Sequence, residues 1–208
     1  MLWYSGMPTR TELRRLPRQS RGRQRVEDLL DAAAAEISGA GYDAATMSSI
    51  AARAGASIGS LYQFFPNKGA IVRALRELYC DEFAAMWEAL TDEAKHLTWK
   101  QLAIRLVDST VSFAERHPAF LALLDAPAST CSSNEVRQRF QKLVATFLVA
   151  RKPRLAPEKA LRLATMTLQM IKAMNFLYRD LSAKERRVYA EEFKVLLSCY
   201  LERRMNSE

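Results

Sequence analysis

The sequence predicts an all-α protein in which a three-helix N-terminal domain is followed by a six-helix domain. Apolar residues recur at helical spacing along almost the whole of the 208-residue chain, and no stretch alternates as a strand would. Most glycines and prolines fall between these periodic stretches, where helices begin or end. Residues 46–68 also read as two short helices joined by a tight turn that contains glycine.

The N-terminal domain is expected over residues 22–68, and its first helix over residues 22–39. The apolar stripe of this helix consists of Val26, Leu29, Leu30, Ala33, Ala34 and Ile37. Gly39 and Gly41 then end the pattern. The stripe predicts that this helix buries one face against the rest of its domain.

The second helix is expected to begin after Thr46, whose hydroxyl can accept an N–H of the first turn. It carries Ile50, Ala51 and Ala54 on one face. Gly55 follows the last periodic residue, where a left-handed backbone conformation favours glycine. This pattern predicts a short helix followed by a tight turn.

The third helix is expected to be capped by Ser57 and ended by Pro66. At 100° per residue, Ile58, Leu61 and Phe65 fall on one side, which predicts that this side faces the core of the domain.

The opposite side of the third helix is small and polar, and it consists of Gly59, Ser60 and Gln63 flanked by Tyr62 and Phe64. Gln63 can make paired hydrogen bonds to adenine, and Ser60 can bond several base edges. Gly59 would let the backbone approach a partner closely, while Tyr62 and Lys68 suit contact with phosphates. We therefore predict a helix-turn-helix that enters the DNA major groove, and the alternative is an ordinary helical hairpin with a polar outer face.

This motif resembles the DNA-binding domain of the TetR (tetracycline repressor) family, and with its flanking helices the resemblance covers about residues 23–82. The matching residues are Gly41, Tyr42, Thr46, Ile50, Ala51, Ala54, Gly55, Ser57, Gly59, Leu61, Tyr62, Phe65 and Lys68. Two positions depart from the family pattern, because Ala56 stands where valine is usual and Phe64 where tyrosine or histidine is frequent. The resemblance implies a homodimeric transcriptional regulator that responds to a small-molecule effector.

Residues 1–21 are expected to form a basic, disordered arm. Seven arginines and a single glutamate precede Val26, so most of the net charge of +8 lies in this region. Such an arm can follow phosphates or enter an A·T-rich minor groove, and the alternative is a solvated tail. Either Met1 or Met7 can be the first residue of the protein. The residues expected to contact DNA are Arg21, Arg23, Arg25, Thr46, Ser57, Gly59, Ser60, Tyr62, Gln63, Phe64 and Lys68.

Residues 69–208 are expected to form the second domain, and a long helix over 68–89 leads into it. Four more helices are predicted over 98–117, 118–124, 158–180 and 182–205, and a fifth follows a loop over 125–133 and reaches Arg151. Three of these helices begin at capping boxes, which are formed by Thr98 with Gln101, Ser132 with Glu135 and Ser182 with Glu185.

The second domain is expected to hold a dimer interface and an effector pocket. The last two helices are apolar on two sides, which predicts that one side meets the domain core and the other meets a second subunit. The expected interface residues are Leu168, Ile171, Tyr178, Phe193, Leu197 and Tyr200. The pocket candidates, which could equally be plain core, are Met86, Trp87, Leu90, Phe113, Phe120, Phe147, Met166, Met170 and Asn175. The effector should be small and largely apolar, with one or two hydrogen-bonding groups.

Several other classes of protein are not indicated. No run approaches 18 apolar residues, so we expect no membrane span and a cytoplasmic protein. The three cysteines form no CxxC pair, although Cys131 in the loop over 125–133 could be a redox-active thiol. We find no nucleophile–base pair, metal cluster or phosphate-binding glycine loop, and we therefore expect no metal, no cofactor and no enzymatic activity. The main prediction is a repressor that a ligand releases from a palindromic operator, and the alternative is an architectural or non-specific DNA-binding protein.

Overall fold

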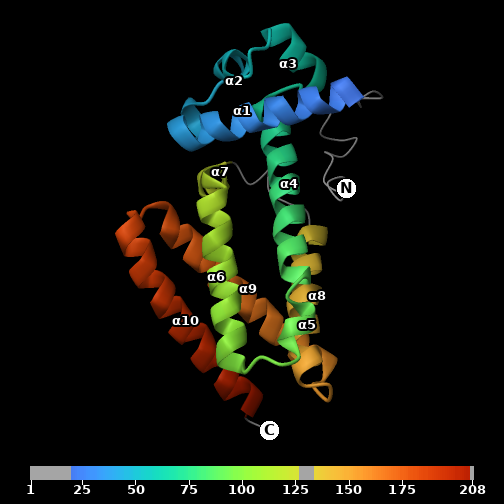
Figure 1. Ribbon diagram of the computed structural model, residues 1–208, viewed down its shortest axis with the longest axis vertical. Coiled ribbons are helices and arrows are strands. Elements are labelled where there is room, and N and C mark those ends of the chain that lie inside the picture. The colour runs from blue at the N-terminus through green and yellow to red at the C-terminus, as the bar shows by residue number, and fades with distance from the viewer. Residues whose placement is uncertain (1–19, 127–133, 207–208) are drawn as a thin grey trace. The chain divides into compact units, whose positions relative to one another are not determined.

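The computed structural model describes residues 20–126 and 134–206, so most of the predicted arm, the capping box at Ser132 and Cys131 lie outside the described residues. The described residues form ten α-helices and one 3-10 helix, with no strand among them, which confirms the all-α class (Figure 1). The helices are α1 Ser20–Ala44, α2 Met47–Arg53, α3 Ile58–Phe64, α4 Lys68–Glu88, α5 Thr91–Ala94, α6 Trp99–Arg116, α7 Pro118–Ala122, η1 Leu123–Asp125, α8 Asn134–Arg151, α9 Pro157–Arg179 and α10 Ala183–Asn206. The one-turn helix α5 was not predicted, because four residues are too few to show a period.

The chain divides into two compact units, which we describe separately. The first contains the described residues up to Glu82 together with residues 117–126, and the second contains residues 83–116 and 134–206. α4 therefore supplies residues to both units. α7 belongs to the first unit because it packs against α1, whereas its sequence position suggested the second domain.

The core of the first unit is built from one apolar face of each of its helices. The stripe of α1 is buried as predicted at Val26, Leu29, Leu30, Ala33 and Ile37, and Ala34 is only partly buried. Ile50 of α2, Leu61 of α3 and Leu75 of α4 are also almost completely buried. The three-helix N-terminal arrangement therefore has an apolar interior of its own.

The two short helices begin where their caps were predicted. The hydroxyl of Thr46 accepts the N–H of Ser49 at 3.1 Å, and the Ser49 hydroxyl accepts the N–H of Thr46 at 3.0 Å. Gly55 has a φ of 58°, in the left-handed region. The hydroxyl of Ser57 accepts the N–H of Ser60 at 3.1 Å and so satisfies a free donor at the start of α3.

The end of α1 differs from the prediction. Gly41 leaves the helical conformation, with a φ of 82° and a ψ of 164°. The residues after it are helical again, and α1 ends at Ala44. The glycine was correctly predicted to interrupt the helix, and the additional turn after it was not predicted.

In the second unit, α10 packs along α6, and α9 packs along α8 (Figure 1). Lys194 of α10 forms ion pairs with Asp108 of α6 at 2.7 Å and with Glu191 at 2.8 Å. The turn between α9 and α10 is closed by a reciprocal pair of hydrogen bonds. The Tyr178 hydroxyl donates to the Arg186 carbonyl, and Arg186 Nε donates to the Tyr178 carbonyl, both at 2.8 Å.

Candidate nucleic-acid interface

The outward face of α3 is open to solvent in the described structure. Gly59, Tyr62 and Gln63 are exposed, whereas Ser60 and Phe64 are half-buried. No described atom beyond its own helix and chain neighbours lies within 4 Å of the position that a Cβ at Gly59 would occupy. The backbone of α3 can therefore be approached closely at this residue.

The prediction for Ile58 was wrong, because this side chain is 44% exposed rather than buried. Ile58 is the first residue of α3, and Phe65 lies about 10 Å further along the axis of this seven-residue helix. A shared angular position does not bury a residue at the end of so short a helix. Ile58 and Tyr62 are four residues apart and together add apolar surface to the exposed face.

Lys68 requires a second correction. Its ammonium group donates hydrogen bonds to the carbonyls of Tyr42, Asp43 and Ala45 at 2.7, 3.2 and 2.8 Å, and it lies 4.3 Å from the centre of the Tyr42 ring. An ammonium group has three N–H donors, and in this geometry all three are used within the protein. We therefore leave Lys68 out of the candidate DNA-binding face.

The basic residues expected to contact DNA are placed only in part. Arg23 is exposed and Arg25 is half-buried on the first turns of α1, whereas the side chain of Arg21 lies outside the described residues. Thr46 is exposed at the start of α2, where it serves as the cap.

An ion pair connects α2 to α1, because Arg53 Nε lies 2.8 Å from a carboxylate oxygen of Glu36. Hydrogen bonds from Arg53, and then from Ser49, lower the pKa of Glu36 below its ordinary value of 4.5. The Glu36 carboxyl is therefore ionised at neutral pH, and the ion pair links the helix that precedes the turn to α1.

Further from α3, the first unit contains a cluster on α4 and at the start of α7. The ring of Tyr79 lies 5.0 Å from that of His117, and His117 Nε2 lies 3.1 Å from a carboxylate oxygen of Glu82. Burial, followed by the nearby carboxylates of Glu82 and Asp31, raises the pKa of Tyr79 to about 12. Tyr79 is therefore neutral at physiological pH.

Most of the aromatic residues predicted to line a pocket form one core cluster in the second unit. Trp87, Phe113 and Phe147 are fully buried, and Phe83 lies among them, 4.7 Å from Trp87 and 5.0 Å from Phe113 between ring centres. Trp87 Nε1 donates to the Ser109 hydroxyl at 2.9 Å, which satisfies its only polar atom. These contacts agree with the alternative that the aromatic residues are packed core.

Other predicted pocket residues are not brought together. Phe120 belongs to the first unit, where its ring lies 6.4 Å from that of Tyr79. Met166 is 43% exposed, which is incompatible with an interior position within this subunit. The three remaining apolar candidates are half-buried, and they are Met86, Leu90 and Met170. Each of these corrections arises from tertiary packing, which the helical period does not report.

Asn175 is different, because it is a buried polar residue on α9. It is 8% exposed, and its side-chain oxygen has no hydrogen-bond partner within the described part of the chain. The hydroxyl of Thr167, two turns earlier on α9, is also buried and lacks a partner among the described residues. Buried polar atoms normally have partners, so these two unpaired oxygens mark the part of α9 where a polar group of another molecule would find a hydrogen-bonding partner.

The predicted dimer residues fall on two different sides of α9 and α10. Ile171, Tyr178 and Leu197 are buried inside the subunit, so this part of the prediction was wrong. The other three are half-buried, and they are Leu168, Phe193 and Tyr200. Both helices also carry large apolar side chains that remain exposed, and these are Leu161, Met166, Phe176 and Leu177 on α9 and Val188, Tyr189, Val195 and Leu196 on α10.

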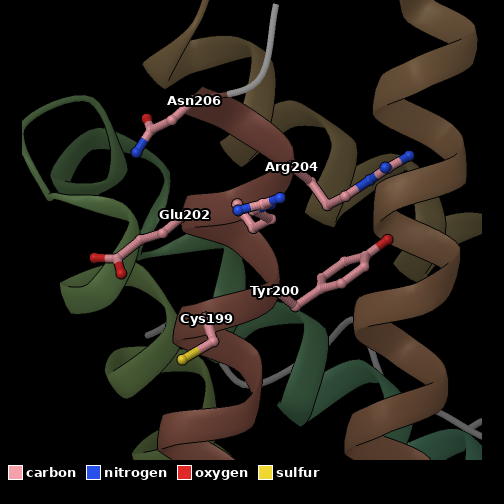
Figure 2. A pocket seen from close by; sticks show the side chains of 6 residues that line it. Cys199, Tyr200, Glu202, Arg204 and Asn206 are labelled. Atoms are coloured by element: carbon pink, nitrogen blue, oxygen red, sulfur yellow. The ribbon is translucent and has the colours of Figure 1, made fainter.

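A surface depression lies near the end of α10 and is lined by Cys199, Tyr200, Glu202, Arg203, Arg204 and Asn206. Figure 2 shows Tyr200 and Arg204 projecting to one side of the helix and Cys199, Glu202 and Asn206 to the other. Because all of its lining comes from one helix, it does not correspond to the interior pocket predicted from the sequence.

No group of three or more His, Cys, Asp or Glu side chains in residues 20–126 and 134–206 is arranged to hold a metal ion. Within the same ranges, no helix combines the length and apolar character that crossing a membrane requires.

The first unit carries a helix-turn-helix and the described part of the second unit is built of helices, and comparison with known families identifies the family that has this arrangement. Residues 29–75 match the family described as bacterial regulatory proteins, tetR family, and residues 98–201 match the tetracyclin repressor-like C-terminal domain. The chain therefore belongs to the TetR family and has the fold of its transcriptional regulators.

Known structures have a similar fold, and a known protein matches part of the sequence. A TetR-family regulator from Streptomyces coelicolor superposes with a TM-score of 0.63 at 24% identity, over 86% of this chain and 98% of that one. A TetR variant from Acinetobacter baumannii AYE in complex with minocycline gives 0.61 at 16% identity, over 86% and 97%. The nucleoid occlusion factor SlmA of Idiomarina loihiensis is 28% identical over 121 residues, and this match spans 58% of the chain and 61% of that relative.

Proposed function

We propose that the protein is a homodimeric transcriptional repressor that reads a palindromic operator with α3 and is released from it by a small, largely apolar effector. The observation that carries this proposal is the open face of α3. Gly59, Tyr62 and Gln63 are exposed on a helix whose other side is anchored in the first unit by the fully buried Leu61. A helix held in this way can enter the major groove without losing its own packing.

Each exposed side chain of α3 suits a contact with DNA. Gln63 would read adenine through paired hydrogen bonds, and Ser60 would bond a neighbouring base edge. Ile58 can contact the methyl group of thymine, and Tyr62 can bind a phosphate. Thr46 and Ser57 cap the starts of α2 and α3, and the N-terminus of a helix favours a bound phosphate. The arginines that would contact the phosphates of the DNA backbone are Arg21, Arg23 and Arg25.

A homodimer follows from the small size of the recognition element. One seven-residue helix reads few base pairs, so two copies are needed, with half-sites about 34–36 Å apart or a multiple of this distance. We assign the interface to the exposed apolar side of α9 and α10. Val188 and Val195 are seven residues apart on α10, as are Tyr189 and Leu196, so each pair lies on one side of the helix.

The interface can be tested by sedimentation of two charged variants. Val195 is 59% exposed, and a Val195→Glu substitution would place a carboxylate in the interface, so we expect monomers. Lys142→Glu brings the same carboxylate to an exposed position of α8, outside the proposed interface, and should leave a dimer. A Val195→Glu variant that sediments as the wild type would remove α10 from the interface.

The effector site is proposed at Asn175. Leaving a buried amide oxygen without a donor costs about 1–3 kcal/mol, and a hydroxyl or N–H group of a bound ligand would relieve this cost. A largely apolar effector with one such donor therefore fits the residue. Native mass spectrometry of the purified dimer tests this proposal directly, because a retained ligand adds its mass, and crystals would show it beside Asn175.

Ligand and DNA binding would be coupled through α4, which supplies residues to both units. A bound ligand that changed the course of this helix would thereby change the spacing of the two α3 helices in the dimer. Because the operator fixes that spacing, DNA affinity would fall, and by reciprocity the operator would weaken ligand binding by the same factor.

Fluorescence anisotropy with a duplex from the region upstream of the protein's own gene tests DNA reading. Gln63→Ala should weaken binding by about 1–3 kcal/mol and relax specificity at one base pair. Gln138→Ala makes the same chemical change at an exposed position of α8 and should leave the affinity unchanged. Equal operator affinities for Gln63→Ala and the wild type would refute the proposed reading.

The alternative is an architectural protein that binds DNA without sequence preference through its arginine-rich N-terminus. Such binding depends on phosphate contacts and therefore falls steeply with salt on every duplex. The repressor should keep a preference for its operator over a scrambled duplex of equal length as salt is raised. Loss of that preference at every salt concentration would favour the architectural function.

A further inference from the structure

Lys68 links two ends of the helix-turn-helix through its side chain. It is the first residue of α4, and its ammonium group reaches back 26 residues to the Tyr42 carbonyl at 2.7 Å. The same group bonds the carbonyls of Asp43 at 3.2 Å and Ala45 at 2.8 Å. The face of the Tyr42 ring lies 4.3 Å away and adds a cation–π contact.

These carbonyls are available because of how α1 ends. Gly41 leaves the helical conformation, and the last carbonyls of a helix have no partner within it. A cation at a helix C-terminus also complements the helix dipole. The half-buried ammonium of Lys68 therefore has both an electrostatic and a hydrogen-bonding reason to remain there.

The position of this contact along the chain matters for α3. Thr46, the cap of α2, directly follows Ala45, and Phe65 ends α3 three residues before Lys68. The segment 46–65, which contains α2 and α3, is thus held near both of its ends by the side chain of Lys68. The length of this segment and the tight turn at Gly55 then set the direction in which α3 projects from the first unit.

We propose that Lys68 is a positioning residue for DNA recognition, which acts through the junction of α1 and α2 and does not contact phosphate. This inference rests on the proposed function. Loss of the ammonium group would free the carbonyls of residues 42–45 and loosen the start of α2. The recognition helix would then lose its fixed orientation while its own base-reading side chains stayed intact.

The test is a Lys68→Met variant, which keeps an unbranched apolar side chain and removes all three donors. Operator affinity, its salt dependence and amide hydrogen exchange are measured where circular dichroism shows the variant folded. We expect a loss of affinity of about tenfold or more, as when a set of partly buried hydrogen bonds is lost. The slope of log affinity against log salt should stay as in the wild type, and exchange at residues 42–46 should become faster.

The salt slope separates the alternatives. A direct phosphate contact would lower its magnitude by about 0.9 in Lys68→Met and leave exchange at 42–46 unchanged. A merely structural role would lower thermal stability and leave operator affinity unchanged in the folded protein. Either result would overturn the proposal. Lys142→Met, the same substitution at an exposed site on α8, should change none of the three measurements.

A second variant covers the case in which Lys68→Met does not fold. Tyr42→Leu removes the ring face but keeps all three carbonyls, so it should weaken operator binding relative to the wild type, again with an unchanged salt slope. Tyr42→Phe keeps the ring face and should bind as the wild type. Wild-type affinity in Tyr42→Leu would count against the positioning role. Absence of operator binding by the wild type would refute the proposed function itself, whereas equal binding by wild type and Lys68→Met would refute only the role of Lys68.

Discussion

Two threonines of α9, Thr165 and Thr167, allow the cost of an unpartnered buried hydroxyl to be measured with a matched pair of substitutions. Thr167 is fully buried, and its hydroxyl has no partner within residues 20–126 and 134–206. Thr165 is half-buried, and its hydroxyl donates to the Leu161 carbonyl at 2.7 Å and accepts from Gln141 at 3.1 Å. Valine has nearly the same shape as threonine and a similar helix propensity, so the two changes differ mainly in hydrogen bonding.

The expected changes have opposite signs. Thr167→Val removes an unpaired buried hydroxyl whose penalty is about 1–3 kcal/mol, so it should raise the free energy of unfolding by up to that amount. Thr165→Val removes two hydrogen bonds at a half-exposed site, where water can replace part of them, and should lower the free energy of unfolding by about 1 kcal/mol. In a chain of this size, 1 kcal/mol shifts Tm by about 2–4 °C.

Thermal and urea unfolding at one fixed protomer concentration measure both variants, because dimerisation makes Tm depend on concentration. A loss of stability in Thr167→Val as large as that in Thr165→Val would contradict an unpartnered Thr167 hydroxyl. That result would mean that the Thr167 hydroxyl has a partner in solution. A tightly held water or ligand on α9 would be that partner, and it would be absent from the variant.

Three further predictions concern the first unit. Leu61→Ala should lower the free energy of unfolding by about 2–5 kcal/mol, because Leu61 is fully buried, and a change below about 1 kcal/mol on urea unfolding would contradict its core position. Tyr79 has its folded pKa raised to about 12, so its contribution to stability is complete below the ordinary value of 10.0 and is lost as pH rises through about 12. Tyr79→Phe should therefore lose less stability between these pH values, and equal losses would argue against a buried Tyr79. For Glu36 the folded pKa is lowered, so stability is present above 4.5 and lost as pH falls through the lowered value. In Arg53→Ala the carboxyl titration of Glu36, followed by NMR, should return toward 4.5, and an unchanged titration would show that Arg53 is not the cause.

Local chemistry along the chain predicted the helices well. Thr98 with Gln101 and Ser182 with Glu185 form the expected reciprocal caps, at 2.9–3.3 Å between backbone nitrogens and side-chain oxygens. Asn67 accepts the N–H of Ala70 at 2.9 Å at the start of α4. Such caps depend on residues three positions apart, so they can be read directly from the sequence.

The features that were missed depend on distant parts of the chain. Nothing near Lys68 in sequence shows that the carbonyls of residues 42–45 will lie beside it. The period of α9 and α10 predicted two apolar sides but not which side faces the subunit core, so Ile171 and Leu197 were assigned to the wrong one. The position of α5 and the grouping of α7 with the first unit likewise follow from packing, and the helical period reports only which side of a helix is apolar.

The reciprocal bonds between Tyr178 and Arg186 have a consequence for how two subunits can meet. Because each residue both gives and receives a hydrogen bond at 2.8 Å, the hairpin of α9 and α10 cannot slide at that end without breaking both. The exposed rows of the two helices keep a constant register. A second subunit would therefore dock on a single preformed template, and mispaired dimers shifted by one helical turn would be disfavoured.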